Sequence, residues 1–416
     1  MSSASWPPVR VGTALVVCAA SLLVACGPAV ADGPHGIDDA RSVRSGPATG
    51  SRLHQPGVQF LPRPGVPSPP AVTALSWAVT DAQSGRILAA KDAHRRLPPA
   101  STLKTLFALT VLPKFPQQAA HTVTDAELAG ILPGSALVGI KEDVRYSVAD
   151  LWRGVFLSSG SDAVRTLAAM NGGWEKTVAD MGAVARRLGA NDTTVRSADG
   201  FDSEGQFSSA FDLSVFGRAG LANPDFARLA STKTAKFPES GGTRAFGIQN
   251  TNRLLVGSHG VVPYPGLIGV KNGYTSQAGN TLVAAAKRNG RTLLVTVMNP
   301  QTSSDNAVYE ETRTLLDWGF SAAPRAAGVG TLPATGPIEL DGDTHSAVRK
   351  SQPAALLNKP AKADAAHGMA LAGERDAQRR TVYVWSLSAV GASALAGAGL
   401  WWRRRKQRNT PPAPLI

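Results

Sequence analysis

Two uncharged apolar segments near the ends of the chain restrict where a soluble core can form. Residues 11–26 follow Arg10 and precede "GPAVADG", the pattern of a signal peptide with a basic n-region, an apolar core and a small-residue cleavage site. Residues 381–402 contain no charged residue and are long enough to span a bilayer as a helix. An export segment and a membrane anchor are therefore expected to bracket the folded part of the chain.

The N-terminal segment permits two kinds of processing. Ala29-Val30-Ala31 fits an A-x-A cleavage site, so we assign residues 1–31 to a signal peptide. "LVAC", ending at Cys26, also resembles the bacterial lipoprotein box, in which that cysteine would carry the lipid. Both interpretations predict export, and lipidation of Cys26 stays open.

The C-terminal apolar segment has the flanks of a membrane span. Tyr383 and Trp385 lie near one end and Trp401 and Trp402 at the other, as aromatic residues do at membrane interfaces. "RRRKQR" follows at once, which predicts a cytoplasmic basic tail over residues 403–416. We therefore expect a single-pass protein of the cell membrane whose folded domain lies outside the cytoplasm.

A second kind of anchoring motif lies upstream. "LPATG", residues 332–336, matches the motif that a transpeptidase cuts to attach proteins to the cell wall. A sorting signal places this motif directly before the apolar segment, whereas here residues 337–380 intervene and Pro337 follows the glycine. We interpret the motif as an exposed turn in a Pro- and Gly-rich spacer.

The region between the anchors divides by composition. Residues 32–70 form a Pro/Gly-rich linker and residues 323–380 a flexible spacer, which leaves residues 71–322 as one domain with ample length for a core. This block opens with a predicted hairpin, continues with helical patterns, and returns to a second hairpin whose turn is Asn289-Gly290, before a closing helix at about 305–318. The pattern predicts an α/β (α+β) domain with one antiparallel sheet and helices packed on it.

Composition excludes several functions. The formal net charge is +13, but five of the 43 Lys and Arg lie in the basic tail and no basic stripe alternates with aromatic residues, so we expect no nucleic-acid partner. The only cysteines, Cys18 and Cys26, lie in the export segment, which leaves the mature domain without a thiol nucleophile. His94, His121 and His259 show no metal-ligand spacing, so no metal is expected.

Ser101 and Lys104 lie three residues apart at the start of an apolar helical stretch, "STLKTLFALTVL". This spacing places both side chains on one face of a helix, where a lysine of lowered pKa can take the proton of a serine hydroxyl. The start of a helix also favours a developing negative charge. A surface Ser and Lys on an ordinary helix remains the alternative, because S-x-x-K alone is a weak signal.

Two further short motifs have equally plain alternatives. Ser159-Gly160-Ser161 fits a helix–helix connection capped by Asp162. Asn272-Gly273 fits a two-residue hairpin turn, or the middle of a Lys-x-Gly triplet on a strand that lines an active site.

In order and rough spacing the three motifs resemble S-x-x-K, S-x-N and K-T-G. With their flanks, such as "YSVADLWRGVFLSSGSDAVRTLA" and "GVKNGYTSQAGNTLVAAAKRNGRTLLVTVM", they resemble the D-alanyl-D-alanine carboxypeptidases among the low-molecular-mass penicillin-binding proteins. The resemblance covers about residues 71–320. It implies a β-lactamase/transpeptidase-like domain, with an antiparallel sheet flanked by helices, joined here to the predicted C-terminal transmembrane helix.

The resemblance also implies a site and a substrate. Ser101 would be the acyl-ester nucleophile, Lys104 the proton acceptor and Ser159 a proton relay. Substrate binding would fall to Lys271, Ser161, Asn272 and the backbone N–H of Tyr274, which with that of Ser101 would form the oxyanion hole. The substrates would be peptidoglycan stem peptides ending in D-Ala-D-Ala, and β-lactams would inhibit by acylating the same serine. The resemblance likewise implies that no organic cofactor is required.

Two positions depart from the family pattern. Ser161 stands where the family has Asn, and Asn272 stands where it has Thr, which changes the groups beside the substrate. A silent module that binds cell wall or a partner is therefore one alternative. A β-lactamase is another, although no E-x-x-L-N segment lies between the second and third motifs.

Overall fold

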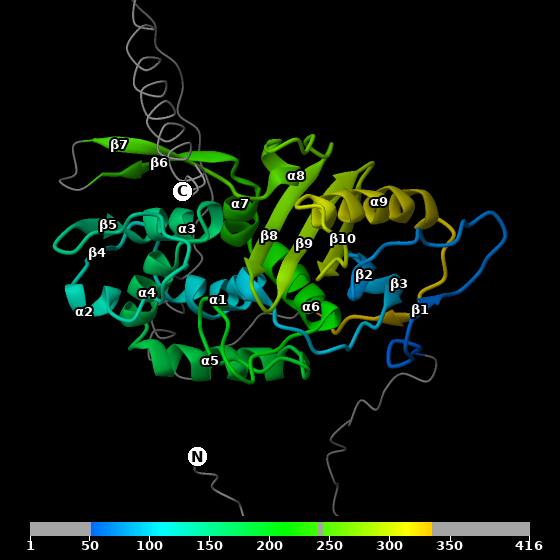
Figure 1. The fold of residues 1–416 in the computed structure, drawn as a ribbon, viewed down its shortest axis with the longest axis horizontal. Coiled ribbons are helices and arrows are strands. Elements are labelled where there is room, and N and C mark those ends of the chain that lie inside the picture. Colours follow the sequence, from blue (N-terminus) through cyan, green and yellow to red (C-terminus); the bar gives the residue numbers. More distant parts are fainter. Residues whose placement is uncertain (1–50, 240–243, 335–416) are drawn as a thin grey trace, which may run out of the picture. The chain divides into compact units, whose positions relative to one another are not determined.

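The protein is described by a computed structural model over residues 51–239 and 244–334 (Figure 1). These residues belong to one compact unit. Within them, no helix is both long enough and apolar enough to cross a bilayer. The predicted signal peptide 1–31, transmembrane helix 381–402 and basic tail 403–416 lie outside the described residues, so their assignments stay predictions.

A mixed architecture is organised around one antiparallel sheet with the strand order β1-β3-β2-β10-β9-β8, in which β11 also pairs with β3. Its strands are β1 (Val58–Phe60), β2 (Ser76–Asp81), β3 (Arg86–Lys91), β8 (Leu267–Thr275), β9 (Gly279–Arg288), β10 (Arg291–Met298) and β11 (Gly330–Thr331). Two small antiparallel pairs lie outside this sheet: β4 (Ala120–Thr122) with β5 (Arg145–Ser147), and β6 (Thr234–Pro238) with β7 (Ala245–Gln249).

Most of the helices lie in the chain between β3 and β8, and α9 follows β10. They are η1 (Ala100–Leu103), α1 (Lys104–Val111), η2 (Leu112–Lys114), α2 (Asp125–Leu128), α3 (Val148–Leu157), α4 (Ser161–Met170), α5 (Trp174–Arg187), α6 (Ala210–Leu221), α7 (Pro224–Ser231), α8 (Arg253–Val256) and α9 (Ala307–Ala322). The predicted closing helix therefore starts two residues late and runs four residues further. The predicted α/β fold, an antiparallel sheet covered by helices, is confirmed.

Both faces of the sheet are buried under helices. Consecutive strand residues point to opposite sides, so neighbours along a strand pack against different helices. Val79 packs with α9 residues such as Leu315 in one cluster, while its neighbour Ala78 packs in a second cluster with the helices α1 and α6. Every residue of α1 is buried, including the polar Lys104, Thr105 and Thr110. The nucleophile segment predicted from the sequence therefore lies at the centre of the domain.

Both predicted hairpins are present. The second turns at Asn289-Gly290, where both residues have positive φ (48° and 76°), as a two-residue type I′ turn requires. Residues 272 and 273 are part of the nine-residue strand β8 instead, and β8 is an edge strand of the sheet. The interpretation that the family resemblance favours, in which Asn272-Gly273 lies on a strand and Asn289-Gly290 forms the hairpin turn, is therefore confirmed.

The folded unit is longer than the predicted 71–322. Residues 58–60 form β1 and residues 330–331 form β11, and both pair with the outer edge of β3. Leu53 is buried beside Gly330, so these two segments also pack together. The Pro/Gly-rich composition suggested a linker and a spacer, but these short strands cover backbone groups that β3 would otherwise expose.

Candidate active site

Ser101 lies in η1, and Lys104 is the first residue of α1. Nζ of Lys104 is 2.9 Å from Oγ of Ser101 and donates to the main-chain oxygen of Asp199 at 2.6 Å. The lysine side chain is only 3% exposed. The structure thus brings together the two residues that the S-x-x-K spacing placed on one face.

Burial sets the protonation of this lysine. Loss of solvent lowers the pKa of Lys104 to about 8, although the carboxylates of Asp199 and Asp162 oppose the shift. A second buried lysine lies nearby, and burial together with the charge of Lys104 holds the pKa of Lys271 well below its usual range. At mildly alkaline pH much of Lys104 is therefore an unprotonated amine in contact with a hydroxyl, which suits a general base.

The Ser159-Gly160-Ser161 turn connects α3 and α4, as the sequence indicated. Ser159 adopts a positive φ of 57°, and its buried Oγ has no hydrogen-bond partner among the described residues. A non-glycine residue in this conformation is strained, and such strain is concentrated at functional sites. The free hydroxyl remains available for a substrate or for a proton.

Asp162 fixes this turn, but not in the way a helix cap would. Its carboxylate accepts hydrogen bonds from the backbone N–H groups of Val138, Gly139 and Ile140, at 2.8–3.1 Å. The loop around residue 138 is thereby held against the start of α4, where the backbone N–H of Ser161 donates to Ala136.

Strand β8 carries the third motif. The side chain of Lys271 is 2% exposed, and its Nζ donates to the main-chain oxygen of Asn272 at 2.9 Å. Tyr274 is 67% exposed and is one of the residues that line the pocket beside β8. Gly273 lies against the start of η1, which brings β8 next to Ser101.

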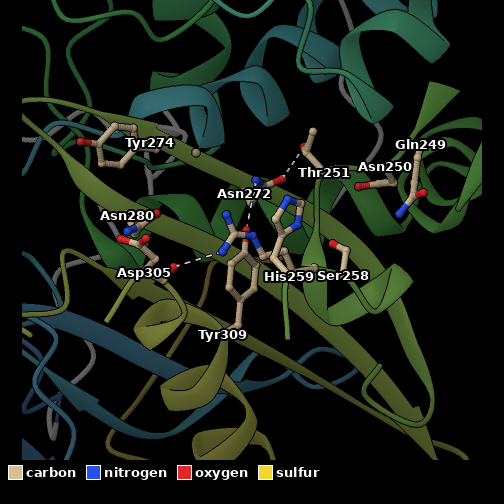
Figure 2. Close-up of a pocket in the computed structure, with 12 residues that line it drawn as sticks. Gln249, Asn250, Thr251, Ser258, His259, Asn272, Tyr274, Asn280, Asp305 and Tyr309 are labelled. Carbon is tan, nitrogen blue, oxygen red and sulfur yellow. Dashed lines mark hydrogen bonds between the residues drawn. The ribbon is translucent and has the colours of Figure 1, made fainter. Parts of the chain in front are cut away.

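Asn272 points into a pocket of about 640 Å³ beside the catalytic strand (Figure 2). Its amide lies between two hydroxyls: Oδ1 accepts from Thr251 at 3.0 Å, and Nδ2 donates to Tyr309 at 3.4 Å. The rest of the lining is mainly polar, with residues from the segment 249–259 and from the start of α9. Asn272, the residue that replaces the family's threonine, is therefore held in the pocket wall by hydrogen bonds to Thr251 and Tyr309.

Two residues at the site were not singled out from the sequence. Asp199 lies in the loop before α6 and contacts Lys104, as described above. Arg253, the one Lys or Arg among the pocket-lining residues, donates to Oδ1 of Asn306 at 2.6 Å and lies over the ring of Tyr309. No local pattern marks either residue, because each reaches the site through contacts distant in sequence.

Comparisons with known proteins agree with this geometry. A family model described as D-alanyl-D-alanine carboxypeptidase matches residues 64–302. The chain is 39% identical over 270 residues to the D-alanyl-D-alanine carboxypeptidase DacB2 of Mycobacterium tuberculosis, covering 64% of this chain and 88% of the relative. It is 34% identical over 266 residues to DacD of Escherichia coli, covering 61% of this chain and 64% of that relative, so it spans under two thirds of DacD.

Solved structures show the same likeness. A crystal structure of a D-alanyl-D-alanine carboxypeptidase from Mycobacterium tuberculosis superposes with a TM-score of 0.59 at 37% identity, covering 65% of this chain and all of the other. Penicillin-binding protein 6B of Escherichia coli gives a TM-score of 0.55 at 34% identity, covering 63% and 82%. The chain therefore belongs to the D-alanyl-D-alanine carboxypeptidase family of serine peptidases.

Proposed function

We propose that this protein removes the terminal D-Ala from peptidoglycan stem peptides ending in D-Ala-D-Ala, through an acyl-ester on Ser101. The observation that carries the proposal is the contact between Ser101 and Lys104, in which Oγ and Nζ lie 2.9 Å apart and burial lowers the pKa of the lysine to about 8. A hydroxyl becomes an effective nucleophile when such a base takes its proton.

Acylation would proceed as follows. Lys104 takes the hydroxyl proton while Oγ of Ser101 bonds to the carbonyl carbon of the penultimate D-Ala. The backbone N–H groups of Ser101 and Tyr274 stabilise the oxyanion. The carbon–nitrogen bond then breaks as the proton passes to the leaving amine through Ser159, whose buried hydroxyl has no hydrogen-bond partner within residues 51–239 and 244–334. Water hydrolyses the ester and frees Ser101, and a β-lactam acylates the same oxygen by opening its ring.

Recognition of the terminal carboxylate would fall to the pocket beside Asn272. Lys271 was predicted for this role, but it is buried and its Nζ is bonded to a main-chain oxygen. The guanidinium of Arg253 lines the pocket and is held in place by Asn306. We assign the carboxylate contact to Arg253 and Asn272. Lys271 stays buried beside Lys104, whose charge lowers the pKa of Lys271.

Labelling with a fluorescent penicillin tests the chemistry. Wild-type protein should become covalently marked and should release D-Ala from a D-Ala-D-Ala peptide, whereas Ser101→Ala should do neither and should melt at the wild-type temperature. Mass spectrometry should place the adduct on Ser101. An adduct on another residue would contradict the assignment.

The same measurements distinguish the proposed function from the two alternatives that the sequence left open, a silent binding module and a β-lactamase. A silent module binding cell wall or a partner would remain unlabelled at all pH values. A β-lactamase would turn over penicillin rapidly and leave little acyl-enzyme, with no release of D-Ala.

We also propose that residues 381–402 hold the enzyme in the cell membrane, with the catalytic domain outside. The uncharged segment, its aromatic flanks and "RRRKQR" support this. Detergent should extract the mature protein with its C-terminus intact, and a variant truncated after residue 380 should be released without detergent. Wall-bound protein ending at Thr335 would show instead that "LPATG" is used for sorting.

A further inference from the structure

The loop that carries Asp199 is fitted against the nucleophile segment at two points. The main-chain oxygen of Asp199 accepts from Nζ of Lys104 at 2.6 Å. The next residue, Gly200, has a φ of +81°, and a Cβ atom there would stand 2.1 Å from the carbonyl oxygen of Ala100. Ala100 precedes Ser101 and itself has a positive φ of 50°. The position of Lys104 relative to Ser101 is therefore fixed by this loop as well as by the helix.

The carboxylate of Asp199 also acts on the protonation of Lys104, because its negative charge raises the pKa of that lysine. Three titratable groups face Lys104 from the elements packed on it: the carboxylates of Asp199 and of Asp162 from α4, and the amine of Lys271 from β8, whose pKa is held well below its usual range. Asp162 accepts hydrogen bonds from several backbone N–H groups of the 138–140 loop, whereas Oδ1 of Asp199 accepts one from the backbone N–H of Phe201 at 3.1 Å.

Asp199 keeps its charge in spite of its environment. Burial raises the pKa of Asp199, but the cation of Lys104, the N–H of Phe201 and the hydroxyls of Ser161 and Ser197 outweigh this effect and leave it below its usual value. A buried carboxylate next to a base favours the protonated form of that base.

We propose that Asp199 is a positioning residue for acylation, whose carbonyl holds the amine of Lys104 on Ser101 and whose carboxylate stabilises the ammonium formed when Lys104 takes the serine proton. The inference rests on the proposed function of Ser101 and Lys104. It predicts that the carboxylate raises the pKa of Lys104, so that the amine loses its proton only at higher pH. The unprotonated amine then binds the serine proton more strongly than it would without the carboxylate.

The test is the pH profile of penicillin acylation in wild type and Asp199→Asn. The amide keeps the main-chain carbonyl and an oxygen for the N–H of Phe201, and it removes only the charge. We expect the midpoint of the profile to move to lower pH by on the order of one unit, and the plateau rate to fall several-fold. Asp199→Glu, which restores the charge, should return the midpoint toward that of wild type.

Asp202→Asn is the matched control. This variant also removes one negative charge from the loop that carries Asp199. In wild type, Oδ2 of Asp202 accepts from the backbone N–H of Gln277 at 3.1 Å, and Asp202 is not among the groups that act on Lys104. Its midpoint should equal that of wild type. Asp199→Ser, smaller and also uncharged, should repeat the shift if Asp199→Asn folds poorly.

Two results would overturn the inference: an unchanged midpoint in both uncharged variants at position 199, or an equal shift in Asp202→Asn. Failure of wild type to acquire a label on Ser101 at any pH would instead refute the proposed function. The two failures are therefore distinguishable.

Discussion

Gly273 of β8 lies directly against the backbone nitrogen of Ser101, and a Cβ atom at position 273 would stand 2.6 Å from that nitrogen. The same Cβ would lie 2.8 Å from Oγ1 of Thr281, whose hydroxyl donates to the carbonyl of Pro99 just before η1. The catalytic strand and the nucleophile segment are thus in contact through a position that has room for hydrogen only. This explains in physical terms why the third residue of the motif is glycine.

Gly273→Ala should therefore separate β8 from η1 and displace the backbone groups predicted to bind the oxyanion. A displacement near 1 Å can reduce a rate about 100-fold, so we expect acylation by penicillin to fall by about that factor. Overpacking should also lower the free energy of unfolding by about 1–3 kcal/mol. Acylation kinetics and urea unfolding measure the two effects.

Gly247→Ala is the control for this change. Gly247 lies in β7, and a Cβ atom there would meet nothing within 4 Å. Both acylation and unfolding should stay close to wild type in this variant. A Gly273→Ala enzyme that acylates at the wild-type rate would show that the contact does not position the site.

Acylation should depend on pH through Lys104. Burial lowers the pKa of Lys104 to about 8, so if its unprotonated amine is the base, about a tenth of the enzyme should be competent to react at pH 7. The second-order rate of acylation should rise about tenfold between pH 7 and a plateau above pH 9. Lys104→Ala should retain only a small residual rate.

The shape of the Lys104→Ala profile decides the assignment. Without the amine, the residual rate should show no inflection near pH 8. If the variant kept both most of the rate and the inflection, another group would have to be the base.

The parts of the site that the sequence predicted are those fixed by local spacing. Ser101 and Lys104 are three residues apart at the start of a helix, so their contact follows from helical geometry. Asn289-Gly290 likewise predicts its own turn, because few dipeptides tolerate two positive φ angles.

The parts that were missed depend on contacts between distant segments. Asp199 reaches Lys104 across 95 residues, and Arg253 reaches Asn306 across 53. The strands β1 and β11 have the composition of a linker and become strands only because the outer edge of β3 is available to pair with them. No periodicity in the sequence marks such positions.

Asn272→Thr restores the residue usual in the family and tests whether the pocket is built around the amide. The two hydrogen bonds of Asn272, to Thr251 and Tyr309, span the pocket wall, and the shorter threonine cannot make both. We expect release of D-Ala to slow by about tenfold, the effect of losing one or two net hydrogen bonds. Steady-state kinetics on a D-Ala-D-Ala peptide measure this change.

Tyr309→Phe refines the result, because it removes only the longer of the two bonds and should cost less than Asn272→Thr. A faster Asn272→Thr enzyme would mean instead that this site has been detuned relative to its family.

The last prediction separates the two basic residues near β8. Arg253 lines the pocket beside Asn272, whereas Lys271 is buried against a main-chain oxygen. If Arg253 binds the terminal carboxylate, wild type should prefer a D-Ala-D-Ala peptide over the same peptide with a C-terminal amide, and Arg253→Ala should lose most of that preference. A hydrogen bond to a charged group is worth about 1.5–3 kcal/mol, so the loss should be roughly 10- to 100-fold in kcat/KM for the acid and small for the amide. Lys271→Met should slow both peptides alike, because it removes a buried amine next to Lys104 and no group of the pocket beside Asn272. If Lys271→Met abolished the preference for the carboxylate and Arg253→Ala kept it, the anchor would be the buried lysine that the motif first suggested.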